Sequence, residues 1–205
     1  MSQPLPASFE RLGPARPCGP VMLAVPHAGR AYPEELNALA AVPLERLEAL
    51  EDRYADLLIA DATESGTIAF VARRARCWID LNRDEREVDR AMIDPPPHPS
   101  RTLVSARVRG GLGLIPRRLQ GLGELWRGPI PAAALARRIA EDYRPWHAAL
   151  ADALAEARGR FGAAMLLDCH SMPPLPSGDD APDIVLGDRF GRSAASRIVD
   201  RLAAV

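Results

Sequence analysis

The chain has 205 residues, and its 26 Lys and Arg residues nearly balance 27 Asp and Glu residues, which gives a formal net charge of −1. This length suits one α/β domain with a sizeable core. The near balance of charge gives no reason to expect a nucleic acid or an anionic membrane surface as a partner.

Three cysteines, Cys18, Cys77 and Cys169, are odd in number and widely spaced. They argue against a disulfide framework and for a reducing compartment, and because no CxxC pair is present, a thiolate zinc site is not expected. The sequence shows no signal-peptide pattern and no apolar run long enough to span a bilayer. We therefore expect a cytoplasmic protein that does not act in a membrane.

Residues 1–20 are rich in Pro, Ala and Gly, which predicts an irregular lead-in. Residues 21–25 form a short apolar strand that Pro26 ends, and His27 follows at once. Gly29 then allows a tight turn or a close approach of the backbone to a ligand. The sequence thus places a histidine at the carboxyl end of a predicted strand.

Leucines at helical spacing predict a helix over residues 43–64. Glu48, Asp52 and Asp56 lie one turn apart on a different face of this helix. Such a face is usually only solvated, but carboxylates at this spacing can also present toward a metal. The residues alone leave both interpretations open.

Two further strands are predicted over residues 67–72 and 77–81, and Asn82 and Arg83 follow the second one. Polar side chains thus gather again where a strand ends. Residues 85–125 are rich in Pro and Gly and too long for a plain connection, so we expect a lid or an active-site loop region there.

Helical spacing of apolar side chains resumes over residues 131–160. Pro145 interrupts this run, so we expect a kink or two abutting helices. His147 lies in this helical stretch and His98 in the Pro-rich segment before it. Both are better explained as structural or exposed histidines than as catalytic ones.

Residues 165–168 form an apolar run of strand length, and Pro173 and Pro174 cannot continue a ladder. Side chains alternate along a strand, so Asp168 and His170 are expected on one face. The carboxylate could then hold the imidazole in one tautomer. The simpler alternative is a surface histidine at the end of a strand.

After a predicted loop over residues 173–182, a last strand is expected at residues 183–187 and a final helix from about Ser193. This helix lacks a C-cap signal, so we expect the domain to be truncated at its C-terminus. Strands that alternate with helices favour an α/β fold, with a mixed, largely parallel sheet flanked by helices. We expect a single domain over residues 21–205.

The polar side chains at the strand ends can converge on one crevice of such a sheet. Two neutral imidazoles, here His27 and His170, and one carboxylate are a common ligand set for catalytic zinc, and they leave a position open for water. Such a zinc ion lowers the pKa of its water to about 7 and polarises a carbonyl. Arg83 would offer a planar fork for a substrate carboxylate.

Five segments, taken in order, resemble the successive motifs of N-formylglutamate amidohydrolases, and the match runs from about residue 20 to the end of the chain. These segments are residues 26–29 (PHAG), 51–58 (EDRYADLL), 79–83 (IDLNR), 168–172 (DCHSM) and 183–191 (DIVLGDRFG). The resemblance implies a zinc hydrolase with the carboxypeptidase-like (phosphorylase/hydrolase-like) α/β fold, related to aspartoacylase and succinylglutamate desuccinylase. It implies one zinc ion per chain as the cofactor.

The resemblance also implies a ligand set for this metal. His27 and His170 are the implied imidazole ligands, and a carboxylate from the second motif joins them. We place this carboxylate at Asp56 first and at Asp52 next. The relatives use a close H-x-x-E pair for the first two ligands, whereas position 30 is an arginine here.

Further roles follow from the same resemblance. The implied catalytic residues are His27, His170 and Asp168. The implied substrate-binding residues are Asn82, Arg83, Ser171 and Arg189, among which the Asn-Arg pair resembles the carboxylate clamp of the relatives. Family members continue past the last residue of this chain, with a Glu that resembles a general base, so we expect the 205 residues to lack that group.

The leading hypothesis is zinc-dependent hydrolysis of the formyl amide of N-formylglutamate, which gives formate and glutamate. One alternative is a related amidase or carboxypeptidase-like hydrolase that acts on another N-acyl amino acid. The other is a binding module that keeps the fold without the chemistry. For the enzyme hypotheses, the expected partner is a small N-acyl amino acid.

Overall fold

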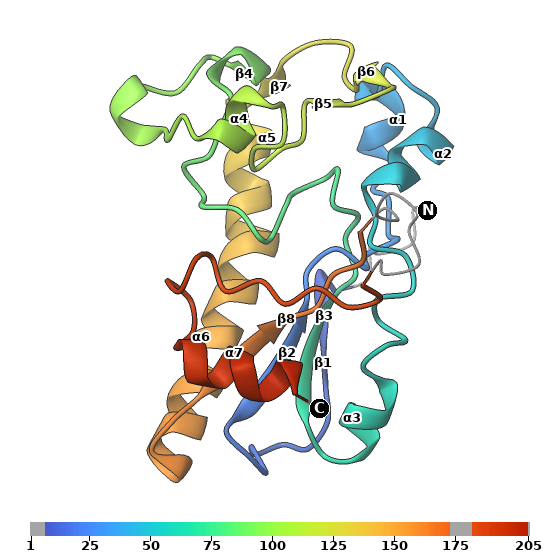
Figure 1. Cartoon of the computed structure of the whole chain (residues 1–205). Helices are drawn as coiled ribbons and strands as arrows, with labels where there is room; N and C mark the ends of the chain where they lie inside the picture. Colours follow the sequence, from blue (N-terminus) through green and yellow to red (C-terminus); the bar gives the residue numbers. More distant parts are fainter. Residues whose placement is uncertain (1–6, 173–181, 205) are drawn as a thin grey trace. The chain divides into compact units, whose positions relative to one another are not determined.

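Four strands form the central sheet of the computed structural model, which describes residues 7–172 and 182–204 (Figure 1). The strands are β1 (Phe9–Leu12), β2 (Val21–Val25), β3 (Ile68–Ala72) and β8 (Met165–Asp168). Their order is β1-β3-β2-β8, in which β2 runs parallel to β3 and β8, and β1 pairs antiparallel with β3. The predicted mixed, mostly parallel sheet is therefore confirmed.

Strand β1 lies within the stretch that the sequence predicts to be irregular, so that prediction is wrong for residues 9–12. The strand is short and its register against β3 pairs Phe9 with Ala72. The ring of Phe9 lies edge-on to Trp146, with the ring centroids 5.5 Å apart. Pairing and packing with distant residues, rather than a local pattern, therefore make this strand.

Alternating side chains of β2 and β3 supply two separate apolar cores. Met22, Ala24 and Phe70 belong to the larger core, which also includes Trp146 from helix α6 (Arg144–Phe161). The side chains that alternate with them along the two strands, such as Leu23 and Val71, belong to a smaller core on the other face of the sheet. Both strands are buried on both sides, as parallel strands under helices are expected to be.

Short helices replace the single helix predicted over residues 43–64, so this prediction is wrong. The elements in this range are α2 (Leu44–Leu47), η1 (Glu48–Leu50) and α3 (Ala60–Glu64), and the short helix α1 (Glu35–Leu39) precedes them. The helix stops after η1 because Glu51 is extended, and the N–H of Asp52 donates to the carbonyl of His27 at 2.9 Å instead of to a helical carbonyl. Tyr54 then has a positive φ of 68°. A tertiary hydrogen bond thus overrides the helical pattern.

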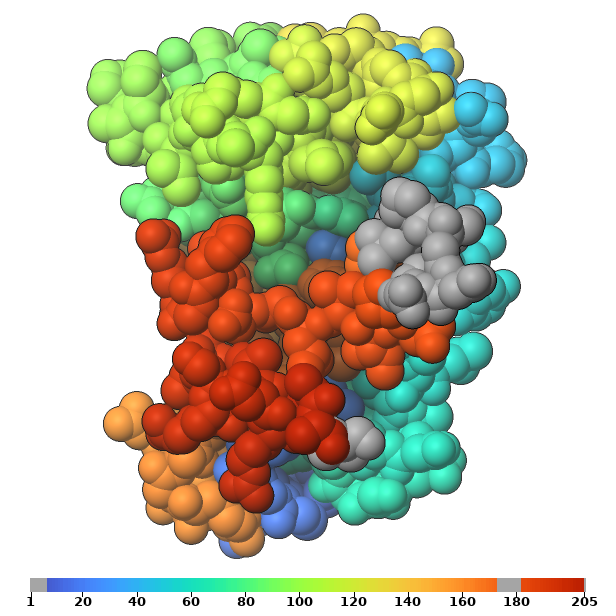
Figure 2. Space-filling model, in the orientation of Figure 1, coloured from blue at the N-terminus to red at the C-terminus, as the bar shows by residue number. Residues whose placement is uncertain are grey.

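Residues 77–81 are buried but do not form the predicted strand. They turn, and the N–H of Asp80 donates to the carbonyl of Leu114 at 2.8 Å. The segment after them contains only short elements: η2 (Arg90–Met92), β4 (Ile93–Asp94), η3 (Pro99–Arg101), α4 (Ala106–Arg109), β5 (Arg118–Leu119), β6 (Gly123–Glu124) and β7 (Ile130–Pro131). In Figure 2, this green and yellow segment forms one continuous part of the surface, beside the blue helices α1 and α2.

The predicted long helix over residues 131–160 is confirmed, with an unexpected feature at its centre. It consists of α5 (Ala132–Arg138), a π-helical turn η4 (Ile139–Tyr143) and α6 (Arg144–Phe161). In the π turn, the N–H of Arg144 donates to the carbonyl of Ile139, five residues back. This wider turn accommodates Pro145, whose ring would clash with a carbonyl four residues earlier in an α-helix.

The chain divides into two compact units, Met1–Ser171 and Met172–Val205, and the single domain expected over residues 21–205 stays a prediction. In the second unit, the final helix α7 spans Ser196–Ala203, close to its predicted place. The strand predicted at residues 183–187 is not formed, and Ile184 is 79% exposed. Most of the loop predicted over residues 173–182 lies outside the described residues. In the parts described, no helix is both long and apolar enough to cross a membrane.

Candidate metal centre

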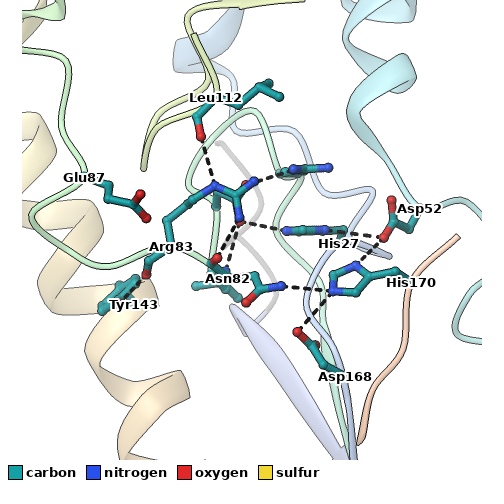
Figure 3. Close-up of polar contacts among 12 residues, drawn as sticks. His27, Asp52, Asn82, Arg83, Glu87, Leu112, Tyr143, Asp168 and His170 are labelled. Carbon is teal, nitrogen blue, oxygen red and sulfur yellow. Dashed lines mark hydrogen bonds and ion pairs between the residues drawn. The ribbon is translucent and has the colours of Figure 1, made fainter. Parts of the chain in front are cut away.

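The two histidines singled out by the sequence lie side by side at the ends of neighbouring strands. Ala24 of β2 pairs with Asp168 of β8, and His27 and His170 follow these strands directly. The imidazole centroids are 4.8 Å apart, with the rings tilted by 46° (Figure 3). Parallel pairing of two distant segments therefore creates the site, at the carboxyl edge of the sheet.

Gly29 allows the turn that follows His27. A Cβ atom at this position would lie 1.9 Å from the carbonyl oxygen of Arg74, so no other residue fits without a shift of the backbone. The close approach lets the N–H of Ala31 donate to the carbonyl of Arg73 at 2.8 Å. The close approach at Gly29 is thus to another segment of the chain, whereas the approach to a ligand stays a prediction.

Asp52 supplies the carboxylate between the two imidazoles (Figure 3). Its Oδ2 atom lies 2.7 Å from Nδ1 of His170 and 3.4 Å from Nδ1 of His27. One ligand atom from each of the three residues lies within 4.8 Å of the others, which is a spacing that can hold a metal ion. Two imidazoles and one carboxylate also form a donor set typical of catalytic zinc.

Asp56, which the sequence ranks first for this role, is not part of the group, so that ranking is wrong. Its carboxylate pairs with Arg30 at 2.7 Å and with Arg73 at 3.9 Å. The predicted helix would have placed both aspartates on one face. Because the helix ends before Asp52, the two side chains take different directions.

His27 is oriented by a residue that the sequence reasoning did not assign. Nε2 of His27 lies 2.7 Å from Oδ1 of Asp80, a fully buried carboxylate, so this nitrogen carries the proton. Nδ1 then presents a lone pair toward Asp52, and this buried atom has no hydrogen-bond partner among the described residues. A buried lone pair without a donor is costly, whereas a cation between His27 and Asp52 would satisfy it. The residues present therefore fit a metal ion.

Asp80 could have been noticed as an acidic residue between Ile79 and Leu81, inside an otherwise apolar run. A carboxylate there is either solvent-exposed or held by cations and hydrogen-bond donors. The second case applies, because Asp80 accepts from Nε of Arg76 at 2.9 Å and from the backbone N–H of Asn82 at 2.9 Å.

His170 is oriented in a similar way. Its Nε2 atom lies 3.1 Å from Oδ2 of Asp168 and 3.0 Å from the side-chain amide of Asn82. Nε2 can either carry a proton toward Asp168 or accept from the amide of Asn82, and with the proton on Nε2, Nδ1 of His170 would be left for a metal ion. The role predicted for Asp168, to hold the imidazole in one tautomer, stays a prediction.

The electrostatics of the cluster keep its carboxylates ionised. Burial alone would raise the pKa of Asp52, but the hydrogen bond with His170 and the nearby His27 hold it below the usual range. Burial likewise opposes ionisation of Asp80, and the hydrogen bond from His27 and the nearby arginines lower its pKa overall. For His170, burial would lower the pKa, but Asp168 and Asp52 raise it to about 9. Without a metal the cluster thus holds a proton that a metal ion would displace.

The predicted substrate-binding residues take different places. Arg83 is buried next to the cluster and donates from Nε to the carbonyl of Leu112 at 2.9 Å and from Nη1 to the carbonyl of Asn82 at 2.8 Å. Its Nη2 atom lies 3.5 Å from Oδ2 of Asp80. Ser171 is exposed directly after His170, and Arg189 belongs to the second unit, so their roles stay predictions.

Three comparisons with known proteins agree on one family. The family model described as N-formylglutamate amidohydrolase matches residues 19–205. An N-formylglutamate deformylase of Pseudomonas aeruginosa is 32% identical over 195 residues, which cover 91% of this chain and 65% of that protein. The chain thus spans about two thirds of the length of this curated relative.

Solved structures show the same relationship. The crystal structure of an N-formylglutamate amidohydrolase from Ralstonia eutropha JMP134 matches with a TM-score of 0.86 and 32% identity, over 97% of this chain and 72% of that one. A protein of Agrobacterium tumefaciens matches with a TM-score of 0.56 and 18% identity, over 97% of this chain and 69% of that one. The second match supports the fold alone.

Proposed function

The chain belongs to the N-formylglutamate amidohydrolase family, and we propose that the protein hydrolyses the formyl amide of N-formylglutamate to formate and glutamate with one zinc ion. The observation that carries this proposal is the cluster of His27, Asp52 and His170, in which Nδ1 of His27 is buried without a hydrogen-bond partner among the described residues. Such a cluster is more than a structural network, because one of its acceptors lacks a donor.

His27, Asp52 and His170 would hold the metal, each through one atom. A zinc ion bound there would supply Lewis acidity toward a carbonyl oxygen and would activate a water molecule. Asp80 and Asp168 would keep the protons of the two imidazoles on Nε2, so that both Nδ1 atoms remain available as ligands. The buried carboxylate of Asp80 and the exposed carboxylate of Asp168 would thus set the tautomers on which the site depends.

Arg83 and Asn82 would orient the substrate. Arg83 uses Nε and one N–H of Nη1 for protein carbonyls, which leaves further N–H groups on its two Nη atoms for a substrate carboxylate. Asn82 lies between Arg83 and His170, where its amide would meet the part of the substrate between the carboxylate and the formyl group. Ser171 and Arg189 remain further candidates for substrate binding.

Metal analysis combined with a formate-release assay tests the proposal. The protein should bind close to one zinc ion and should release formate from N-formylglutamate only when metal is present. A panel of other N-acyl amino acids separates this substrate from the related amidase activities. Absence of metal-dependent hydrolysis of any of these compounds would refute the proposed function.

A variant pair tests the metal site independently of activity. His170→Ala should lose most zinc affinity, because it removes one of three protein ligands. The matched control is His98→Ala, since His98 is exposed and only caps the short helix η3. Equal zinc content in both variants would show that the site lies elsewhere.

A further inference from the structure

The segment of residues 78–83, called the site loop below, carries Asp80, Asn82 and Arg83 but belongs to no strand or helix. One helix holds its backbone. The carbonyl of Trp78 accepts from Nη1 of Arg138 at 3.0 Å, and the carbonyl of Arg83 accepts from the hydroxyl of Tyr143 at 2.6 Å. Three side chains of the same helix thus reach the loop, since Nε2 of His147 also lies 3.1 Å from the carbonyl of Leu81.

The start of the site loop is held by its side chain as well. Nε1 of Trp78 donates to Oδ2 of Asp142 at 2.7 Å, and the guanidinium of Arg138 lies over the Trp78 ring at 3.6 Å from its centroid. Trp78, Arg138 and Asp142 are all buried. The four helix residues that contact the loop, Arg138, Asp142, Tyr143 and His147, are called the clamp residues below.

The π turn η4 explains how the clamp residues face one loop. An α-helix advances about 100° per residue, so Tyr143 would lie roughly 140° around the axis from Arg138, and His147 would lie roughly opposite it. In a π turn, hydrogen bonds join residues five apart, which brings the side chains of Arg138 and Tyr143 toward the same direction. The turn spans residues 139–143, between these two side chains. An uninterrupted α-helix would spread these four side chains over about half of its circumference.

We propose that the π turn η4 and the clamp residues position the site loop, so that Asp80 and Asn82 meet the two imidazoles and Arg83 faces the substrate. This inference rests on the proposed function for its catalytic consequence, but the positioning itself concerns only the chain's own contacts. Among the contacts of the described residues, the clamp residues reach the site loop at the carbonyls of Trp78, Leu81 and Arg83 and at the Trp78 side chain. They act through the backbone of the site loop and through the Trp78 side chain, and they are positioning residues.

Tyr143→Phe is the sharpest test, because it removes one hydroxyl and keeps the ring that packs on His147 at 4.2 Å between centroids. Native-state hydrogen exchange of the Asp80 and Asn82 amides should quicken at least threefold. The amides of α6 serve as an internal reference and should stay unchanged, whereas a general loss of stability would quicken both. The matched control is Tyr54→Phe, since the Tyr54 side chain is exposed.

Kinetics supply the second readout. Tyr143→Phe should raise KM for N-formylglutamate severalfold through the misplaced Arg83, with kcat changed less than twofold and zinc content unchanged. If the wild type releases no formate but exchange in the site loop still quickens, the proposed function fails and the positioning inference stands. Unchanged exchange of the Asp80 and Asn82 amides in Tyr143→Phe overturns the inference, whatever the kinetics.

Discussion

The buried carboxylate of Asp80 allows a strong test of the site, through the isosteric change Asp80→Asn. Asp80 accepts hydrogen bonds from His27 and from Arg76 and lies 3.5 Å from Nη2 of Arg83. The amide of an asparagine has one acceptor oxygen and a donor NH₂ group. At least one of the N–H groups that now donate to Asp80 would therefore face the NH₂ group of the introduced amide. Arg76 and Arg83 would also lose the negative charge of the carboxylate next to them.

Two magnitudes follow for Asp80→Asn. Loss of an outer partner of a metal-bound histidine typically weakens metal binding about 10–100-fold, because the imidazole is no longer held in the right tautomer. Removal of one member of a buried ion pair costs about 3–5 kcal/mol, and we expect the lower end because the Arg76 side chain is 16% exposed. At roughly 2–4 °C per kcal/mol for a chain of this size, the metal-free variant should melt about 6–12 °C lower.

Zinc affinity from competition with a chromophoric chelator and thermal unfolding of the metal-free protein measure these effects. The matched control is Asp89→Asn, since Asp89 pairs with Arg117 at 3.0 Å and accepts from the N–H of Ala91 but contacts no imidazole. The control should keep wild-type zinc affinity. A zinc affinity of Asp80→Asn within threefold of wild type would refute the orienting role of Asp80.

Three other predictions concern residues around the site. Arg83→Lys keeps the charge but loses the planar guanidinium, so kcat/KM should fall on the order of tenfold with zinc content unchanged. Wild-type kinetics would exclude Arg83 as the group that binds the substrate carboxylate. Asp56→Asn should keep wild-type zinc affinity. It should lower the free energy of unfolding, measured in urea, by under about 1 kcal/mol, because its partner Arg30 is half-exposed. A loss of zinc affinity would instead indicate that Asp56 is a ligand. Burial lowers the pKa of His147, so the unfolded chain gains a proton near pH 6.5 that the folded chain resists. Stability should therefore fall between pH 7.5 and 5.5 by more in wild type than in His147→Gln, and an equal fall in both proteins would contradict a half-buried neutral imidazole.

The sequence predicts the parts of the site that depend on strands, and it does so for a physical reason. The apolar runs that form β2 and β8 end at or near prolines, and polar residues follow them directly. Parallel strands in one sheet bring their carboxyl ends to one edge, so His27 and His170 could be expected to meet. Their meeting needs only the order and direction of the strands.

The parts that the sequence does not predict depend on contacts between distant segments. Asp52 replaces Asp56 because one backbone hydrogen bond to His27 ends the helical pattern, and no local signal reports that bond. Residues 77–81 are as apolar as a buried strand, but side chains of a helix about sixty residues later hold their backbone instead of a ladder. The sequence thus shows that this segment is buried, but it does not show which groups form hydrogen bonds with its buried backbone.

The place of β8 in the strand order has a consequence for how the protein would fold and for how it would aggregate. Among the described strands, β8 lies at an edge of the sheet and has only four residues. His170 is 118 residues from Asp52 in sequence, so the site assembles only after this late-synthesised strand has docked. A metal ion at a concentration of about 1,000 times its Kd would add about 4 kcal/mol to that docking. Removal of the metal by a chelator should then loosen the edge strand β8 first. The backbone N–H and C=O groups of β2 would become exposed, and they are a template for pairing with strands of other molecules and for aggregation.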